Sequence, residues 1–91
     1  MLNTIKRALG LGSDPFVGSI SLFPGSRAPE NFVVCDGRPM ECNKYPELFS
    51  VIGFIYGGNT EKFTFAIPKL NPVGDVKYYI CYAGTYPRFR D

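Results

Sequence analysis

Residues 45–58, YPELFSVIGFIYGG, decide how the rest of this chain has to fold. Three apolar residues in this stretch, Leu48, Phe49 and Ile52, are spaced so that they fall on one face of a helix. At about two turns, such a helix is too short to be stable alone in water. We therefore expect a β-sheet, formed by the flanking segments, to cover this apolar face.

The sequence also predicts where this helix begins and ends. Pro46 suits the first helical position, where its missing N–H removes no hydrogen bond. Gly53 favours an end to the helix, because glycine readily takes the left-handed conformation that is common just beyond a helix C-terminus. The predicted helix therefore runs from Pro46 to just before Gly53.

Four segments around the helix have the patterns of β-strands: residues 16–23, 32–35, 62–67 and 76–83. In residues 16–23 and 62–67 apolar side chains alternate along the chain, which predicts one buried face. Residues 32–35 and 76–83 are apolar on both faces, which is typical of a central strand. For residues 76–83 a second interpretation is that one face meets another subunit.

Turn residues complete the prediction of the fold. Asp36-Gly37 is typical of a hairpin turn, so we expect the chain to reverse there and lead into residues 38–40. Ten glycines, eight prolines and 15% aromatic residues indicate short strands joined by tight turns. The predicted fold class is α+β: residues 15–91 form mainly short antiparallel β-strands packed around one short central helix.

Residues 1–14 are expected to form a separate N-terminal helical arm. Leu2, Ile5 and Leu9 fall on one side of a short helix. Such a helix could fold back on its own domain or fray, as chain termini often do. The other interpretation is a docking arm whose apolar edge fits a neighbouring subunit.

Charge and hydropathy exclude two classes of partner. The net charge of +2 comes from scattered basic residues, whereas nucleic-acid binding requires a concentrated basic patch. No apolar run reaches the roughly 20 residues that a membrane helix needs, so we expect no membrane insertion. The N-terminus lacks the pattern of a secretion signal, and we expect a soluble protein made in a cytoplasm.

The residue types also argue against an enzyme. There is no histidine, which removes the commonest general base and the commonest zinc ligand. The three cysteines form no C-x-x-C motif, and we expect three reduced, mostly buried thiols. Glu41, Glu47 and Asp36 are better explained by solvent exposure and turn formation than as a catalytic carboxylate pair. We expect no catalytic residues, no metal and no cofactor.

The C-terminal residues are the candidates for partner binding. The tail TYPRFRD carries Tyr86, Arg88 and Phe89, and Tyr82 precedes it at the end of a predicted strand. Exposed aromatic side chains in a tail are typical of an interface.

Several short motifs, in this order along the chain, resemble the phage tail collar domain family. They are Cys35-Asp36-Gly37, Leu48-Phe49-Ser50, Tyr56-Gly57-Gly58, and the FxxPxL pattern of residues 65–70. The resemblance covers residues 15–91, because KYYICYAGTYPRFRD also looks like the closing strand and tail of short family members. The family includes the collar regions of phage tail fibres and the bacterial proteins called microcystin-dependent.

This resemblance implies a non-enzymatic structural component of a bacteriophage virion tail, as a collar, fibre or baseplate module made in the host cytoplasm. It also implies that other virion tail proteins are partners and that the chain forms a homo-oligomer, a trimer or a hexamer. Some family members hold a metal through histidines or carry a long insertion before the last strand. This chain has no histidine and only residues 71–75 at that place, so those properties do not carry over.

The alternative function is a host-surface adhesin that binds glycan. Tyr78, Tyr82, Tyr86 or Phe89 would stack on sugar rings, and the nearby Arg88 or Arg90 would recognise acidic groups. Aromatic residues in strands more often belong to the core, so this hypothesis requires an open pocket.

Overall fold

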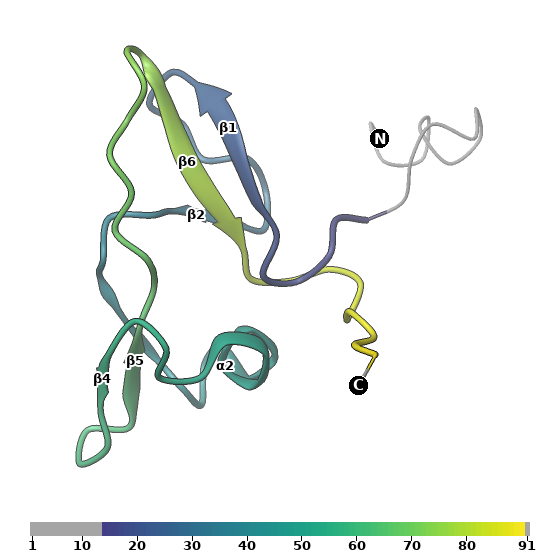
Figure 1. Ribbon diagram of the computed structural model, residues 1–91, viewed down its shortest axis with the longest axis vertical. Helices are drawn as coiled ribbons and strands as arrows, with labels where there is room; N and C mark the ends of the chain where they lie inside the picture. The colour runs from purple at the N-terminus through teal and green to yellow at the C-terminus, as the bar shows by residue number, and fades with distance from the viewer. Residues whose placement is uncertain (1–13, 91) are drawn as a thin grey trace.

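The computed structural model describes residues 14–90 of the chain. They form two small three-stranded antiparallel sheets and one short helix (Figure 1). The first sheet has the order β1 (Ile20–Pro24), β6 (Val76–Cys81), β2 (Phe32–Val34). The second sheet has the order β3 (Pro39–Glu41), β5 (Thr64–Ala66), β4 (Gly58–Asn59), and helix α2 (Pro46–Ile52) lies between β3 and β4 in the chain. The architecture agrees with the predicted α+β class, while residues 1–13 of the predicted arm lie outside the described part.

Helix α2 begins and ends where its sequence predicts. Pro46 occupies the first helical position, and Gly53 follows the last turn with a φ of 52°. The backbone N–H of Gly53 donates a hydrogen bond of 2.7 Å to the carbonyl oxygen of Phe49, which closes the helix. Both ends therefore lie where predicted, although Gly53, with a ψ of −136°, is not in the left-handed helical conformation that was expected.

The apolar face of α2 is covered, as its length requires. Leu48 and Ile52 are buried in the core. The ring of Phe49 packs against the ring of Phe65 in β5, with 5.4 Å between their centroids. The second sheet thus supplies the surface without which a helix of seven residues would not form.

The core joins both sheets and the helix. Its buried members are Val17, Cys35, Met40, Cys42, Leu48, Ile52, Phe65, Ile67 and Ile80. They come from segments spread over most of the described chain, so the two sheets share one hydrophobic core.

Strand β6 is the central strand of the first sheet, which confirms one of the two interpretations of residues 76–83. It pairs with β1 on one side and with β2 on the other. Tyr79, Ile80 and Cys81 are all buried, so successive residues of β6 are covered on both faces. This explains why the segment is apolar without alternation.

Strand β1 is shorter than predicted. The prediction that it begins at residue 16 is wrong, because Phe16 to Ser19 form a turn in which the N–H of Ser19 bonds to the carbonyl of Phe16. Gly18 has a φ of 89° there. The strand begins at Ile20, and the side chains of Ile20 and Leu22 are 40% and 47% exposed.

The prediction of a hairpin at Asp36-Gly37 is also wrong. Gly37 has the positive φ expected of the turn, 80°, but β2 pairs with β6 and β3 pairs with β5. The chain therefore does not reverse at this point and instead passes from the first sheet to the second. Asp36 forms a β-bridge with Lys69 on the returning segment, so the two crossings lie side by side. The N–H of Leu70 bonds to the carbonyl of Cys35 in the same crossing.

Strand β5 is shorter than the predicted segment 62–67. It begins at Thr64, and Phe63 before it has a positive φ of 51°, although the carbonyl of Phe63 still accepts a hydrogen bond from the N–H of Cys42. Phe65 and Ile67 are buried on the predicted face.

Candidate interaction surfaces

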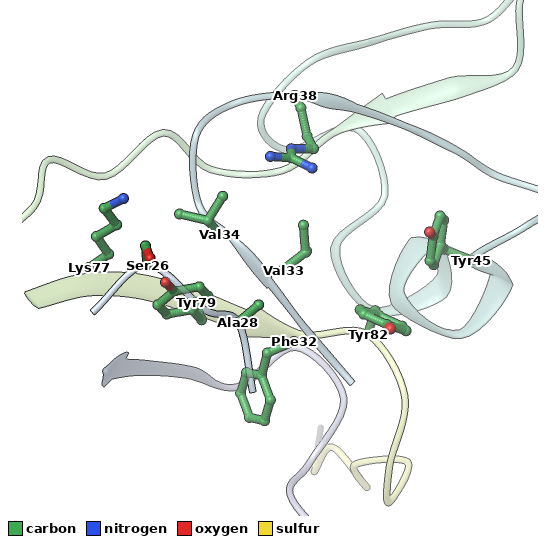
Figure 2. A pocket seen from close by; sticks show the side chains of 10 residues that line it. All are labelled: Ser26, Ala28, Phe32, Val33, Val34, Arg38, Tyr45, Lys77, Tyr79 and Tyr82. Carbon is green, nitrogen blue, oxygen red and sulfur yellow. The ribbon is translucent and has the colours of Figure 1, made fainter. Parts of the chain in front are cut away.

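A hollow of about 400 Å³ lies beside β2, between the first sheet and the start of α2 (Figure 2). Three tyrosines and two cations are among the residues that line it: Tyr45, Tyr79, Tyr82, Arg38 and Lys77. Figure 2 shows Tyr45 and Tyr82 next to each other at one end and Lys77 at the other. The hollow therefore combines aromatic surface with positive charge, a combination suited to sugars or acidic groups.

One of these cations already has a partner. The guanidinium of Arg38 donates three hydrogen bonds to the Asp36 carboxylate, from Nε to Oδ1 at 3.0 Å and to Oδ2 at 3.1 Å, and from Nη2 to Oδ2 at 2.8 Å. These hydrogen bonds hold the pKa of the Asp36 carboxyl below its usual value and raise the pKa of Arg38. The pair reduces the positive charge that Arg38 can offer to a ligand, and Lys77 is the stronger candidate for that role.

The tyrosines contribute unequally to the hollow. Tyr79 is only 2% exposed, and its ring packs edge-to-face on Phe23 at 5.8 Å, so it forms part of the wall. Tyr82 is partly buried against the core and packs edge-to-face on Tyr45 at 5.2 Å. Among the tyrosines, the accessible surface is therefore that of Tyr45 and Tyr82, and the partly exposed ring of Phe32 adds to the lining. Sequence reasoning did not find Tyr45, which is far from Tyr82 in the chain and comes close only in the fold.

The other predicted binding residues lie on the C-terminal tail. The hydroxyl of Tyr86 hydrogen-bonds to the hydroxyl of Ser50 on α2 at 2.7 Å, which fixes the start of the tail against the helix. Arg88 is exposed, and Phe89 is 71% exposed. Tyr82 lines the hollow, but these three residues are not among those that line it. The structure therefore places the predicted partner-binding residues at two different sites, the hollow and the C-terminal segment. The other three predicted residues, Leu2, Ile5 and Leu9, lie outside the described part of the chain.

The tail is also tied to the start of the described chain. Thr85 donates its N–H to the carbonyl of Pro15 and accepts a bond from the N–H of Val17, both at 2.9 Å. Phe16 and Thr85 form a parallel bridge, and the Phe16 side chain is exposed. The segments that lead toward the two chain ends therefore run side by side (Figure 1).

A third surface is apolar and follows α2. Phe54, Ile55, Tyr56 and Phe63 are all exposed, and Ile55 is 75% exposed. Phe49 anchors this group, because its ring contacts those of Phe54 and Phe63 at 5.2 and 5.6 Å. Exposed apolar groups gathered in one place are typical of a protein interface. The signal of this surface in the sequence is the uninterrupted run FIY after the helix end.

The described residues offer little to catalysis. Within residues 14–90 no group of three or more acidic, cysteine or histidine residues could hold a metal ion. The three cysteines are free and buried, and burial raises the pKa of each thiol, that of Cys35 to about 11. Such thiols stay protonated near neutral pH and are poor nucleophiles. None of the described helices has the length and apolar character to span a membrane.

Comparison with known proteins adds one match. A sequence model described as Phage Tail Collar Domain matches residues 18–72, which is more than half of the chain. The matched part begins just before β1 and ends before β6, so it includes α2 and the second sheet. No curated protein matches the chain.

Proposed function

Because the chain belongs to the phage tail collar domain family, we propose that it is a structural component of a bacteriophage virion tail, acting without catalysis in the assembly or attachment of tail parts. The observation that carries this proposal is the family match over β1 to β5. The module would sit in the collar, the fibre or the baseplate.

The described surface supports a docking role. Ile55 projects from the loop after α2, and Phe89 projects from the C-terminal tail, both with most of their side chains exposed. In a free monomer this apolar area would remain in water, whereas in an assembled virion tail it would be covered by neighbouring proteins. We propose that the C-terminal segment forms one contact with other proteins of the virion tail. The residues of this contact are Tyr82, Tyr86, Arg88 and Phe89.

Residues 1–14 are the second proposed contact. Leu2, Ile5 and Leu9 would dock the arm on a neighbouring subunit. Residues 15–17 run beside Thr85, so the N-terminal arm and the C-terminal segment both lead away from the same place. We propose that they contact the same neighbouring subunit. The proposed assembly is symmetric, a trimer or a hexamer, as the family resemblance implies.

The experiment that tests this function is electron microscopy of intact particles, to locate the chain by its density. We expect the protein at the tail, in contact with other tail proteins. A variant lacking residues 1–13 should fold but enter particles less well. Particles that assemble normally without the protein, or that hold it nowhere in the tail, would refute the proposal.

The hollow beside β2 favours a second candidate function, binding of a host-surface glycan. Tyr45 and Tyr82 provide ring surface there, and Lys77 provides a positive charge for an acidic sugar. A glycan array with the wild-type protein tests this candidate. Binding to acidic glycans should be lost in Tyr82→Ala and kept in Ile55→Ala, and an array without any signal above background would eliminate it.

A further inference from the structure

The outer edge of β1 has free backbone groups, as any edge strand does. In the pairing of β1 with β6, Ser19 accepts a bond from the N–H of Cys81, and Gly25 donates to Asp75. In an antiparallel ladder alternate residues point their backbone groups at the partner strand. Ser19, Ser21 and Phe23 therefore face β6, and Ile20 and Leu22 point their N–H and C=O groups away from it.

None of the hydrogen bonds among residues 14–90 satisfies these outward groups of Ile20 and Leu22. β1 is the last strand of its sheet, and no described strand lies along its outer side (Figure 1). The edge thus presents two N–H donors and two C=O acceptors to solvent. Pro24, which has no N–H, ends the edge at one side.

Proteins normally protect such an edge, and β1 is protected only at its two ends, by a bulge where Gly18 and Ser19 both bond to Cys81 and by Pro24. Common devices are charged side chains, a proline within the strand or a bulge. Between these ends, Ile20 to Phe23 include no charged residue, no proline and no bulge. The side chains of Ile20 and Leu22 are on one face of the sheet and are nearly half exposed. Between Ile20 and Phe23 the edge is therefore open both in its hydrogen bonds and in its apolar surface.

We propose that β1 pairs with β1 of a second copy of this chain, antiparallel, about a two-fold axis at Ser21. This register places Ile20 of each copy opposite Leu22 of the other. Residues of such a pair exchange two hydrogen bonds, so the two pairs use all four outward groups of each copy. The two sheets become one sheet of six strands, and each exposed Ile20 side chain packs on an exposed Leu22 side chain.

A second copy fits this edge better than an unrelated strand does. Self-pairing about a two-fold axis brings each charge on the edge toward its own duplicate, and this edge carries none. The free groups are also self-complementary, because the two donors and two acceptors match their own rotated set. The match depends only on β1 and is independent of the proposed tail function. Pairing of β1 with β1 of a second copy favours an assembly with two-fold axes, such as a hexamer, over an isolated trimer.

The contact is small, so we expect weak pairing. Interfaces well below about 1,000 Å² rarely hold two proteins together at low concentration. Copies held near one another in a larger assembly would pair more fully, because their effective concentration is high. The pairing should therefore be sought over a range of concentrations, from about 10 μM to about 1 mM.

Cross-linking of the full chain tests the register. Ser21 faces Ser21 of the other copy across the proposed axis, at a Cα separation near 4.5 Å that a disulfide can span. We expect Ser21→Cys to form a covalent dimer under mild oxidation. Ser26→Cys, at an exposed position in the following loop, is the matched control and should not. Wild-type protein controls for the three native cysteines, which are buried. A Ser21→Cys protein that cross-links no faster than Ser26→Cys overturns the proposal.

Sedimentation velocity of the full chain tests the pairing itself. We expect reversible formation of even-numbered species in wild-type protein and their loss in Leu22→Lys, which brings two like charges to the contact. Ile55→Lys adds the same charge at a more exposed site and should keep the pairing. Unchanged melting temperatures would show that both variants fold. A strictly monomeric wild type at about 1 mM, or only odd-numbered species, overturns the proposal.

Discussion

Gly84 lies directly against the carbonyl oxygen of Pro15, at a place where a Cβ atom on Gly84 would overlap that oxygen. The contact belongs to the region where the N–H of Thr85 bonds to the same oxygen at 2.9 Å. Only glycine allows the two backbones to approach so closely. The start of the C-terminal tail is therefore held to residues 15–17 by backbone contacts.

We expect Gly84→Ala to lower the free energy of unfolding by about 2–3 kcal/mol, because the new methyl group must displace backbone rather than a flexible side chain. Thermal or urea unfolding measures this. Gly74→Ala is the control, since its methyl group would meet open space and only its φ of 61° opposes it, at about 1 kcal/mol. Equal stabilities for the two variants would argue against the close approach.

The Asp36–Arg38 pair allows a prediction about pH. Arg38 lowers the pKa of the Asp36 carboxyl below its ordinary value of 3.8. A carboxyl with a lowered pKa in the folded state contributes stability above its unfolded pKa and loses it as the pH falls through the folded pKa. We therefore expect the contribution of this pair to be present at neutral pH and to fade below pH 3.8. Both side chains are nearly half exposed, so the contribution is small.

Arg38→Gln should raise the pKa of Asp36 toward its ordinary value, as measured by carboxyl ¹³C chemical shifts during an NMR titration. Arg38→Lys keeps the charge but loses the two-pronged hydrogen bond, so its effect should be intermediate. If Arg38→Gln leaves the titration of Asp36 where it was, the hydrogen bonds do not cause the shift.

The three thiols give a prediction about reactivity. Burial, and next the negative charge of Asp36, raise the pKa of Cys35 to about 11. The neutral thiol is thus favoured in the folded state, and its contribution to stability is lost as the pH rises from 9.0, its ordinary pKa, through about 11. Near pH 8, folded protein should react with Ellman's reagent far more slowly than unfolded protein, which should show three thiols. Rapid labelling of one thiol in the folded protein would contradict the burial of all three.

Residues that act on their own backbone allowed the ends of the helix to be predicted from the sequence. Pro46 and Gly53 delimit α2 because each acts through its own backbone geometry. The central place of β6 was one of two interpretations, and it follows from the absence of a polar face in residues 76–83. The prediction failed at Gly37, because a positive φ serves a hairpin and a crossing between sheets equally well. Which of the two forms depends on β6 and β5, and those strands are distant in sequence.

The candidate sites were harder to predict for a related reason. Tyr45 and Tyr82 meet in the hollow only because the start of α2 lies beside the end of β6. No spacing in the sequence links them. The exposure of Ile55 was hidden as well, because an apolar run after a helix looks the same whether it enters the core or leaves it.

Leu48 and Ile55 separate the core of the fold from the proposed docking surface. Leu48 is fully buried in the core, whereas Ile55 is mostly exposed just beyond the same helix. Leu48→Ala should lower the free energy of unfolding by about 2–5 kcal/mol, because it leaves a cavity under α2. Ile55→Ala should change it by less than about 0.5 kcal/mol.

In assembly the order of the two variants should be reversed, with Ile55→Ala the more affected of the two. Ile55→Ala should reduce incorporation of folded protein into tails, because it removes apolar area from a surface that neighbouring proteins would cover. Urea unfolding and the amount of protein in purified particles give the two measurements, with Lys62→Ala, at another exposed position near the second sheet, as the surface control. Should Ile55→Ala enter particles as well as Lys62→Ala does, the apolar surface after α2 has no part in docking. Should it instead melt like Leu48→Ala, Ile55 belongs to the core.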